Sequence, residues 1–337
     1  MPGQTKIKTP TSLQEVFKAF EGLNVLIVGD VMIDSYLWGK VERISPEAPV
    51  PIVNVHKRDK RLGGAANVAL NIQALGATPL LCSVIGNDLD GDNFLTLLNQ
   101  NQLSTEGILR SEERVTTIKH RVISGSHHML RVDSEIDTPL NKKNEEELIK
   151  KIKNLLPKSD VIIFQDYDKG VITERIIGEI IAQSKAQKIP TVTDPKKRNF
   201  LKYNGVTLFK PNRKELIEGL KLDSDLSEIS EVEQAVEQLK LILNTPSVLI
   251  TLSERGIFID SENQKHWISA HIREICDVSG AGDTVISVAA LCQALKLPPK
   301  AIASLSNLAG GIVCEHVGVV PVNKEKLYLE ANKLQLI

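Results

Sequence analysis

Net charge, long hydrophobic runs and paired cysteines are all scarce or missing in this chain of 337 residues. The formal net charge is −1, so the chain has no electrostatic basis for binding nucleic acid or an anionic membrane surface. No apolar run reaches the length that spans a bilayer, and the N-terminus lacks the apolar core of a signal peptide. We therefore expect a cytoplasmic protein with neither nucleic acid nor membrane as a partner.

The sequence also lacks the residue spacings that are typical of metal sites and of disulfide-bonded domains. The cysteines show no Cys-x-x-Cys spacing and stand mostly among apolar residues, so we expect buried free thiols in a reducing compartment. The histidines show no His-Glu-x-x-His spacing, and His127–His128 fits a polar pair on a strand better than a metal site. Walker A, protein-kinase and Gly-x-Gly-x-x-Gly motifs are absent, which argues against P-loop enzymes and dehydrogenases. The four cysteines are Cys82, Cys276, Cys292 and Cys314.

Strand-like and helix-like segments alternate through most of the chain. This alternation predicts an α/β fold with a doubly wound, mainly parallel sheet and helices on both faces. No repeat or linker divides residues 1–337, so we expect a single domain. The predicted strands are 24–30, 79–85, 161–164, 191–193, 207–209 and 248–251, and the predicted helices are 65–75 (closed by Gly76), 92–103, 144–155 and 173–188.

Two segments interrupt this alternation. Residues 36–60 contain Pro46, Pro49 and Pro51 and are too broken by proline for a helix, so we expect extended chain there. Residues 116–133 are typical of two strands, 117–123 and 128–133. We interpret both segments as a small β-lid over one end of the sheet. An edge extension or a dimerisation flap is the alternative, and a lid can serve as both.

The segment Asp277-Val278-Ser279-Gly280-Ala281-Gly282-Asp283-Thr284 leads directly into an apolar helix. Its small residues let backbone amides approach a ligand, and the N-terminus of a helix favours an anion such as phosphate. A carboxylate beside bound phosphate needs a purpose, and deprotonating an attacking hydroxyl is one. The alternative is a plain turn with Asp283 as a favourable residue of the first helical turn.

Charged and polar residues follow most of the predicted strands, at the edge of a parallel sheet where ligands bind, and a further cluster follows the first lid segment. Each cluster alone fits an ordinary solvated loop, but their repetition beside the Gly-Ala-Gly-Asp turn indicates a site. Carboxylates and amides near the first strand suit a polyhydroxylated ligand, and the lysines and arginines of later loops suit phosphates. We therefore expect a sugar and a nucleotide in one site. The clusters are 29–34, 63–67, 165–170, 194–198, 210–215 and 253–256.

These segments resemble the ribokinase/PfkB family of carbohydrate kinases. Residues 277–284 are similar to its second signature, and Gly63-Gly64-Ala65-Ala66-Asn67 is similar to part of its first. Within the family the chain looks most like the bacterial heptose kinases, from about residue 12 to its end. The segments most similar to that branch are Gly29-Asp30-Val31-Met32-Ile33-Asp34, 43–51, Asp166-Tyr167-Asp168-Lys169-Gly170 and Lys210-Pro211-Asn212.

The resemblance implies a role for each matching residue. Asp283 corresponds to the catalytic base, and the amides of Gly280, Ala281 and Gly282 correspond to the anion hole for the transferring phosphoryl group. In the Asn-x-x-Glu motif Glu215 would help to place Mg²⁺, through water. Residues similar to the nucleotide-binding set of the family are Asn212, Arg213, Lys214, Glu215, Thr251, Ser253, Gly256 and Asn307. Residues similar to its sugar-binding set are Asp34, Gly63, Gly64 and Asn67.

The heptose branch implies a sugar substrate that already carries a phosphate. From charge and placement alone, the candidates to bind that phosphate are Lys169, Lys196, Arg121 and Arg131, and the alternative for each is an ordinary surface charge. The expected substrates are ATP and D-glycero-β-D-manno-heptose 7-phosphate, with Mg²⁺ as cofactor and heptose 1,7-bisphosphate as product. The resemblance leaves a requirement for a monovalent cation open.

Three further expectations concern the protein as a whole. The sequence contains no His-x-Gly-His motif and no nucleotidyltransferase domain after the kinase part, so we expect a monofunctional kinase of surface-polysaccharide precursor synthesis. Relatives often dimerise through the lid, which implies a homodimer. Two other functions stay open: a kinase of the same family acting on another sugar, sugar phosphate or nucleoside, and a non-catalytic sugar-phosphate sensor. An intact Gly-Ala-Gly-Asp turn argues against the sensor.

Overall fold

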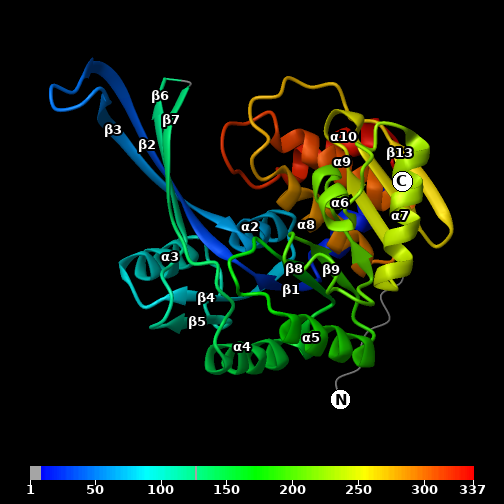
Figure 1. Ribbon diagram of the computed structural model, residues 1–337. Coiled ribbons are helices and arrows are strands. Elements are labelled where there is room, and N and C mark those ends of the chain that lie inside the picture. Colours follow the sequence, from blue (N-terminus) through cyan, green and yellow to red (C-terminus); the bar gives the residue numbers. More distant parts are fainter. Residues whose placement is uncertain (1–8, 126) are drawn as a thin grey trace.

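A nine-stranded sheet forms the centre of the computed structural model, which describes residues 9–125 and 127–337 (Figure 1). The strand order is β13-β12-β11-β10-β9-β8-β1-β4-β5, and all neighbours are parallel except β12 and β13, which form antiparallel pairs. The strands are β1 (Asn24–Gly29), β4 (Thr78–Gly86), β5 (Ile108–Ser111), β8 (Val161–Gln165), β9 (Thr191–Asp194), β10 (Leu208–Phe209), β11 (Ser247–Thr251), β12 (Ile257–Ser261) and β13 (Gln264–Ile268).

Helices cover both faces of this sheet, because the central strands are apolar on both sides. Along β1, Val25 and Ile27 contribute to one hydrophobic cluster, and Leu26 and Val28 to the other. The first cluster takes side chains from α1 (Leu13–Phe20), α2 (Ala65–Ala74), α3 (Leu89–Gln100), α8 (Ala281–Ala294), α9 (Pro299–Val313) and α10 (Lys324–Lys333). The second takes them from α4 (Lys142–Leu155), α5 (Glu174–Gln187), α6 (Arg213–Leu220) and α7 (Ile229–Leu243).

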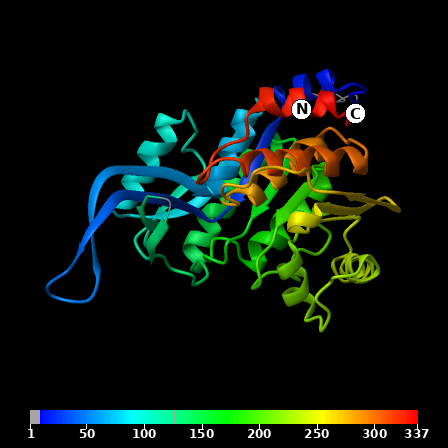
Figure 2. The same ribbon diagram turned by 90° about the horizontal axis from the view of Figure 1, so that it is seen from above.

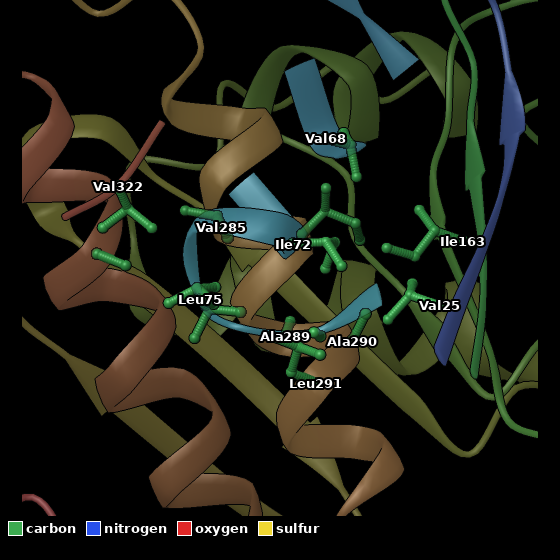
Figure 3. Packing of buried hydrophobic residues seen from close by; sticks show 14 of the residues in the cluster. Val25, Val68, Ile72, Leu75, Ile163, Val285, Ala289, Ala290, Leu291 and Val322 are labelled. Atoms are coloured by element: carbon green, nitrogen blue, oxygen red, sulfur yellow. The ribbon is translucent and has the colours of Figure 1, made fainter. Parts of the chain in front are cut away.

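Helix α8 is buried along most of its length. Figure 3 shows Val285, Ala289 and Ala290 of α8 packed near Ile72 of α2 and Val25 of β1. Eleven of its residues are buried, including Asp283 and Thr284 in the first turn. A helix held in this way presents its N-terminus at a defined place beside the carboxyl ends of the strands.

A second sheet of four strands projects from the body of the molecule (Figures 1 and 2). Its order is β3-β2-β6-β7, with β2 (Val31–Ile44), β3 (Pro51–Gly64), β6 (Ile118–Ser124) and β7 (His127–Ser134). Most of both segments expected in a lid lies in these strands, although β2 begins five residues before residue 36. Residue 126 of the second segment lies outside the described residues. The roots of β2 and β3 are buried, whereas β7 is exposed along nearly its whole length.

The predicted doubly wound, mainly parallel sheet is confirmed, but three of its strands, β5, β12 and β13, were not among the predicted strands, and other elements differ at their ends. The helix predicted over 92–103 is α3, which begins at Leu89 because Asp88 caps it by accepting a hydrogen bond from the Gly91 amide. Three cysteines are buried free thiols as expected, but Cys276 is exposed, since it lies in the loop before α8. No helix among the described residues is long and apolar enough to cross a membrane.

Candidate active site

The carboxylate of Asp283 lies at the centre of a buried hydrogen-bond cluster. Asn67, in the first turn of α2, donates its side-chain amide to Oδ2 of Asp283 at 2.7 Å. Oδ1 accepts two hydrogen bonds, from the Tyr167 hydroxyl at 2.6 Å and from the Gln165 side chain at 3.2 Å. The structure therefore brings two of the expected site residues, Asp283 and Asn67, into direct contact, although they lie 216 positions apart.

Burial, together with the nearby charge of Asp194, raises the pKa of Asp283 to about 6. The hydrogen bonds from Asn67 and Tyr167 and the charge of Lys210 act in the opposite direction. At pH 7 roughly nine-tenths of the groups are still ionised, since the pH is about one unit above the pKa. The carboxylate can therefore accept a proton at neutral pH, while its pKa lies much closer to neutrality than that of a solvated aspartate.

The Gly280–Gly282 turn meets the requirements for an anion site in part. Gly280 precedes α8 with φ 82°, a conformation that favours glycine, and a Cβ there would lie 3.1 Å from the Asn67 side-chain nitrogen. No side chain in the described part of the chain caps α8, so its first-turn amides are not taken by a capping group there. The Ala281 amide makes a long bond of 3.3 Å to the Val278 carbonyl, so this one of the three expected amides is already used by the turn.

A buried ion pair lies next to this turn. Lys210 and Asp194 are 3.0 Å apart and only 2% and 4% exposed. A Cβ on Gly282 would lie 3.7 Å from the Asp194 carboxylate and 3.9 Å from the Lys210 ammonium. The other carboxylate oxygen of Asp194, Oδ1, is buried without a partner among the described residues. A positive charge and an unpartnered acceptor therefore both lie beside the N-terminus of α8.

Asp30 organises the loop that follows β8. Its carboxylate accepts three backbone amides, from Tyr167 at 2.8 Å, Lys169 at 3.2 Å and Val171 at 3.0 Å. The sequence interpretation assigned the carboxylates near the first strand to a polyhydroxylated ligand. For Asp30 that interpretation is wrong, because its side chain is 1% exposed and committed to the loop. Asp30 instead holds Tyr167 in place beneath Asp283.

The Asn-x-x-Glu motif forms a capping box at the start of α6. The Asn212 side chain accepts from the Glu215 amide at 2.8 Å, and Glu215 Oε2 accepts from the Asn212 amide at 2.8 Å. The other oxygen of Glu215 pairs with Lys196, whose pKa is raised by the charges of Asp194, Glu215 and Asp283 against the effect of burial. Lys196, a candidate to bind the phosphate of the sugar substrate, is therefore paired with Glu215, the candidate magnesium residue.

Two residues of the same motif lie outside this cluster. Arg213 donates to the Asp225 carbonyl at 2.6 Å and pairs with its carboxylate at 3.4 Å. The Lys214 side chain is 82% exposed and faces Glu218 on the same helix. Their contacts run along α6 and the loop after it, because only positions 212 and 215 of the motif face the sheet edge.

Two of the other expected nucleotide-binding residues, Asn307 and Gly256, lie against the end of β13 and the segment after it. Asn307 of α9 donates to the Ser269 carbonyl at 2.8 Å. Gly256 lies so close that a Cβ would be 2.0 Å from the Ile268 carbonyl oxygen, and its φ of 89° also favours glycine. Thr251, at the end of β11, forms an isolated bridge with Asn212, and Ser253 follows in the short 3₁₀ helix η2 (Ser253–Arg255). Asn307 and Gly256 thus lie near the end of β13, whereas Thr251 lies beside Asn212.

The expected sugar-binding residues Asp34, Gly63 and Gly64 lie at the root of the lid. Asp34 is 3% exposed, and a Cβ on Gly63 would lie 2.3 Å from its Oδ2, so only glycine leaves room for the carboxylate. Gly64 precedes α2 with φ 60°, and its own Cβ would meet the Asp30 carbonyl at 2.5 Å. This tight turn places Asn67 against Asp283.

Three of the four candidate phosphate ligands lie together on the lid side. Arg121 of β6 pairs with Asp34, and its guanidinium lies 5.4 Å from the Tyr36 ring centre. Lys169 pairs with Glu135 at 2.7 Å, and Glu135 also pairs with Lys119 at 2.8 Å. Arg131 pairs with Asp133 at 3.1 Å, but its side chain is 62% exposed.

Several site residues were quoted in the strand-end clusters but not assigned a role. Gln165, Tyr167, Asp194 and Lys210 all contact Asp283 or lie beside its turn, and each comes within three residues after a strand or at its last residue. Their position at or just after the end of a strand was the one feature of the sequence that could have identified these four residues. Nothing in the sequence distinguishes them from their neighbours Asp168 and Lys197, because the direction of a loop side chain is set by contacts distant in the chain.

Comparison with known proteins gives consistent matches. A family model described as pfkB family carbohydrate kinase matches residues 23–326. The bifunctional protein HldE of Syntrophotalea carbinolica is 38% identical over 94% of this chain and 65% of its own length. HldE of Wolinella succinogenes is 39% identical over 87% of this chain and 61% of its own length. The chain thus spans less than two thirds of the length of these relatives.

Solved structures share the fold. Phosphofructokinase-2 from Escherichia coli in complex with potassium superposes with a TM-score of 0.75 at 16% identity, covering 92% of this chain and 99% of its own. Ribokinase from Arabidopsis thaliana, complexed with ribose and ATP, superposes with a TM-score of 0.69 at 14% identity, covering 91% and 98%. At such identities the likeness establishes a common architecture.

Proposed function

Because the chain belongs to the pfkB family of carbohydrate kinases, we propose that it phosphorylates the anomeric hydroxyl of D-glycero-β-D-manno-heptose 7-phosphate. Family membership confirms the resemblance found in the sequence and makes the chain a sugar kinase that uses ATP. The observation that carries the proposed chemistry is the buried Asp283 carboxylate in the first turn of α8, beside amides that no side chain caps. The heptose substrate rests on the similarity to heptose kinases and to the HldE relatives.

The chemical step follows from this placement. The sugar hydroxyl gives its proton to Asp283, and its oxygen forms a bond to the γ-phosphorus of ATP while the bond to the β,γ-bridging oxygen breaks. ADP leaves with the electron pair of that bond, and the sugar leaves as a phosphate ester. The first-turn amides of α8 stabilise the charge that develops on the transferring group, and the neighbouring Lys210 adds a positive charge.

The residues present fit a magnesium ion that retains its waters. Among the described residues no group of three His, Cys, Asp or Glu side chains could form a protein cage for a metal. Mg²⁺ commonly keeps several waters and binds through one or two carboxylates and the substrate phosphates. Glu215 would bind such an ion through water, and the unpartnered Oδ1 of Asp194 offers an acceptor to its hydration shell. The ion would neutralise charge on the β- and γ-phosphates.

We assign the substrate phosphate to Arg121 and Lys169. Both side chains are partly exposed, at 17% and 19%, and both lie on the lid side of Asp30 and Asp34. Each has a carboxylate partner, Asp34 or Glu135, which a phosphate could replace. Lys196 faces Glu215 and Arg131 faces solvent, so neither is placed as well.

The lid supports a homodimer as part of the proposal. Its outer strands β3 and β7 are sheet edges, and apolar side chains are exposed along it: Ile44, Val50, Leu130 and Val132 are 50–60% exposed. Exposed apolar edges of this kind are common sites of strand or sheet association. Closure of the lid over bound sugar would exclude water from the transferring phosphoryl group.

The deciding experiment is ADP release with Mg²⁺-ATP against a panel of sugars and sugar phosphates that includes the heptose 7-phosphate. Turnover mainly with the heptose phosphate would support the proposal. Preference for another sugar or nucleoside would keep Asp283 as the base and reject the substrate. Binding of a sugar phosphate without ATP consumption by any acceptor would reject catalysis and favour a sensor.

A further inference from the structure

Tyr167 makes three contacts that connect different parts of the candidate site: one with Asp30, one with Asp283 and one with Lys196. Its backbone amide donates to Asp30 at 2.8 Å, and its hydroxyl donates to Asp283 Oδ1 at 2.6 Å. The face of its ring lies 5.7 Å from the Lys196 ammonium, which pairs with Glu215. The half-buried Tyr167 side chain therefore contacts the candidate base, Asp283, on one side and Lys196, the partner of Glu215, on the other.

The two oxygens of Asp283 differ in the acceptor capacity that remains. A carboxylate oxygen accepts about two hydrogen bonds. Oδ1 already accepts from Tyr167 and Gln165, whereas the one donor to Oδ2 among the described residues is Asn67, at 2.7 Å. An incoming sugar hydroxyl can therefore donate to Oδ2 without displacing a protein donor. The Tyr167 hydroxyl need not leave its position when the acceptor binds.

We propose that Tyr167 is a positioning residue for the base: its hydroxyl fixes Oδ1 of Asp283 so that Oδ2 faces the acceptor and takes its proton. This inference rests on the proposed function for the proton transfer, but not on the identity of the sugar. The hydroxyl of Tyr167 remains a donor throughout and does not itself lose a proton in the step. Asp30 supports the arrangement by holding the loop from which Tyr167 projects.

The electrostatics around Asp283 make this hydrogen bond measurable. The charged groups that face Asp283 are Asp194 from β9, Lys210 from the segment after β10, and Lys196 from the loop after β9. Burial and Asp194 raise the pKa of Asp283, and the bond from Tyr167 opposes them. Burial and the charge of Asp283 raise the pKa of Tyr167 well above its usual value, so it stays protonated wherever the base is ionised.

The test compares Tyr167→Phe with Tyr203→Phe. The second variant is a matched control, because Tyr203 is fully buried and donates to another buried aspartate, Asp166, at 2.9 Å. For Tyr167→Phe we expect kcat to fall about tenfold and the acid limb of kcat/KM to move up by about one pH unit, as loss of a bond to a charged group implies. The KM for ATP should stay within about twofold of the original value. Tyr203→Phe should lower the melting temperature and leave the acid limb in place.

Two further measurements keep the inference separate from the proposed function. The pKa of Asp283, followed by ¹³C NMR of the carboxyl carbon without substrate, should rise in Tyr167→Phe whether or not any sugar is phosphorylated. If Tyr167→Phe does not fold, 3-fluorotyrosine at the same position gives a stronger donor and should move the pKa downwards. An unchanged acid limb and an unchanged carboxyl titration in both Tyr167 proteins would overturn the inference. Absence of turnover in the original protein, with the NMR shift present, would reject the proposed function alone.

Discussion

The two ends of the candidate site differ in how far their polar and charged side chains are exposed to water. At the α8 end, Gln165, Asp194, Lys210 and Asp283 are between 1% and 4% exposed and lie on the sheet or on a buried helix. At the lid end, the side chains of Lys119, Arg121, Lys169 and Glu135 are between 14% and 26% exposed, and two of them come from a projecting sheet. Charge is paired at both ends, but the cations of the lid end are more exposed to water than Lys210 at the α8 end.

This difference indicates how the work is divided. Removing one partner of a buried pair leaves a charge without compensation, so the α8 end can change little without loss of the reaction. Pairs in contact with water contribute little to stability, so a substrate phosphate can replace Glu135 as the partner of Lys169 at small cost. We therefore expect the α8 end to determine whether phosphoryl transfer occurs and the lid end to determine which sugar receives it.

The strongest test of this division is Asp283→Asn. We expect kcat to fall by about three orders of magnitude or more, because the sugar hydroxyl loses its proton acceptor, while the fold is retained. ADP release and circular dichroism measure the two properties. Asp260→Asn is a matched control, since Asp260 is 3% exposed, close to the 4% of Asp283, and pairs with Lys240 on β12 away from the base. Near-normal turnover of Asp283→Asn would remove the α8 end from the chemistry.

The second test addresses the lid end through Lys169→Ala and Arg121→Ala. Each should raise the KM for the sugar phosphate by about 10- to 100-fold, as loss of a charged bond to phosphate implies, and change the KM for ATP by less than about twofold. Lys153→Ala is the control, because Lys153 pairs with Glu179 at 2.7 Å in a similar way on α4. Equal changes in both KM values would show that the two ends do not divide the substrates.

A third test uses pH to compare the ends. Asp283 must be ionised to act, and its pKa is raised to about 6, so kcat/KM should be constant above pH 7 and fall as the pH drops through 6. A solvated aspartate would place that fall about two units lower. The measurement is kcat/KM from pH 5 to 8 at constant ionic strength. A second acceptor without a phosphate distinguishes the base from titration of the substrate phosphate.

The sequence predicted the α8 end better than the lid end, for a physical reason. Gly280, Gly282 and Asp283 follow one another in the chain, and the requirements for a tight turn before a helix are visible in a single segment. The sheet class was equally accessible, because buried parallel strands and amphipathic helices alternate along the chain. Asn67 could be placed near the base through the resemblance, but its 2.7 Å contact with Asp283 depends on how α2 and α8 pack.

The lid end depends on pairings that no local pattern specifies. Lys169, Lys119 and Glu135 come from three different segments, and Arg121 reaches Asp34 only because β6 lies parallel to β2. Charge alone suggested Lys196 and Arg131 equally, yet one faces Glu215 and the other solvent. The role of Asp30 could not be predicted either. The sequence shows that the residue is an aspartate, but not whether its carboxylate binds a ligand or backbone amides.

The smallest expected effect concerns the outermost part of the lid, where the comparison is sharpest. Leu130 is 58% exposed on the edge strand β7, so Leu130→Glu should break a homodimer formed there while changing kcat by less than about twofold. Light scattering measures the mass, and Ile242→Glu on α7, 43% exposed and far from the lid in the chain, is the control. A dimer that survives Leu130→Glu would place the interface elsewhere. A monomer with a much higher KM for the sugar phosphate would show that the lid end needs the second subunit to bind substrate. The physical reason would be that strands with water on both sides lack the packing that holds the α8 end in place.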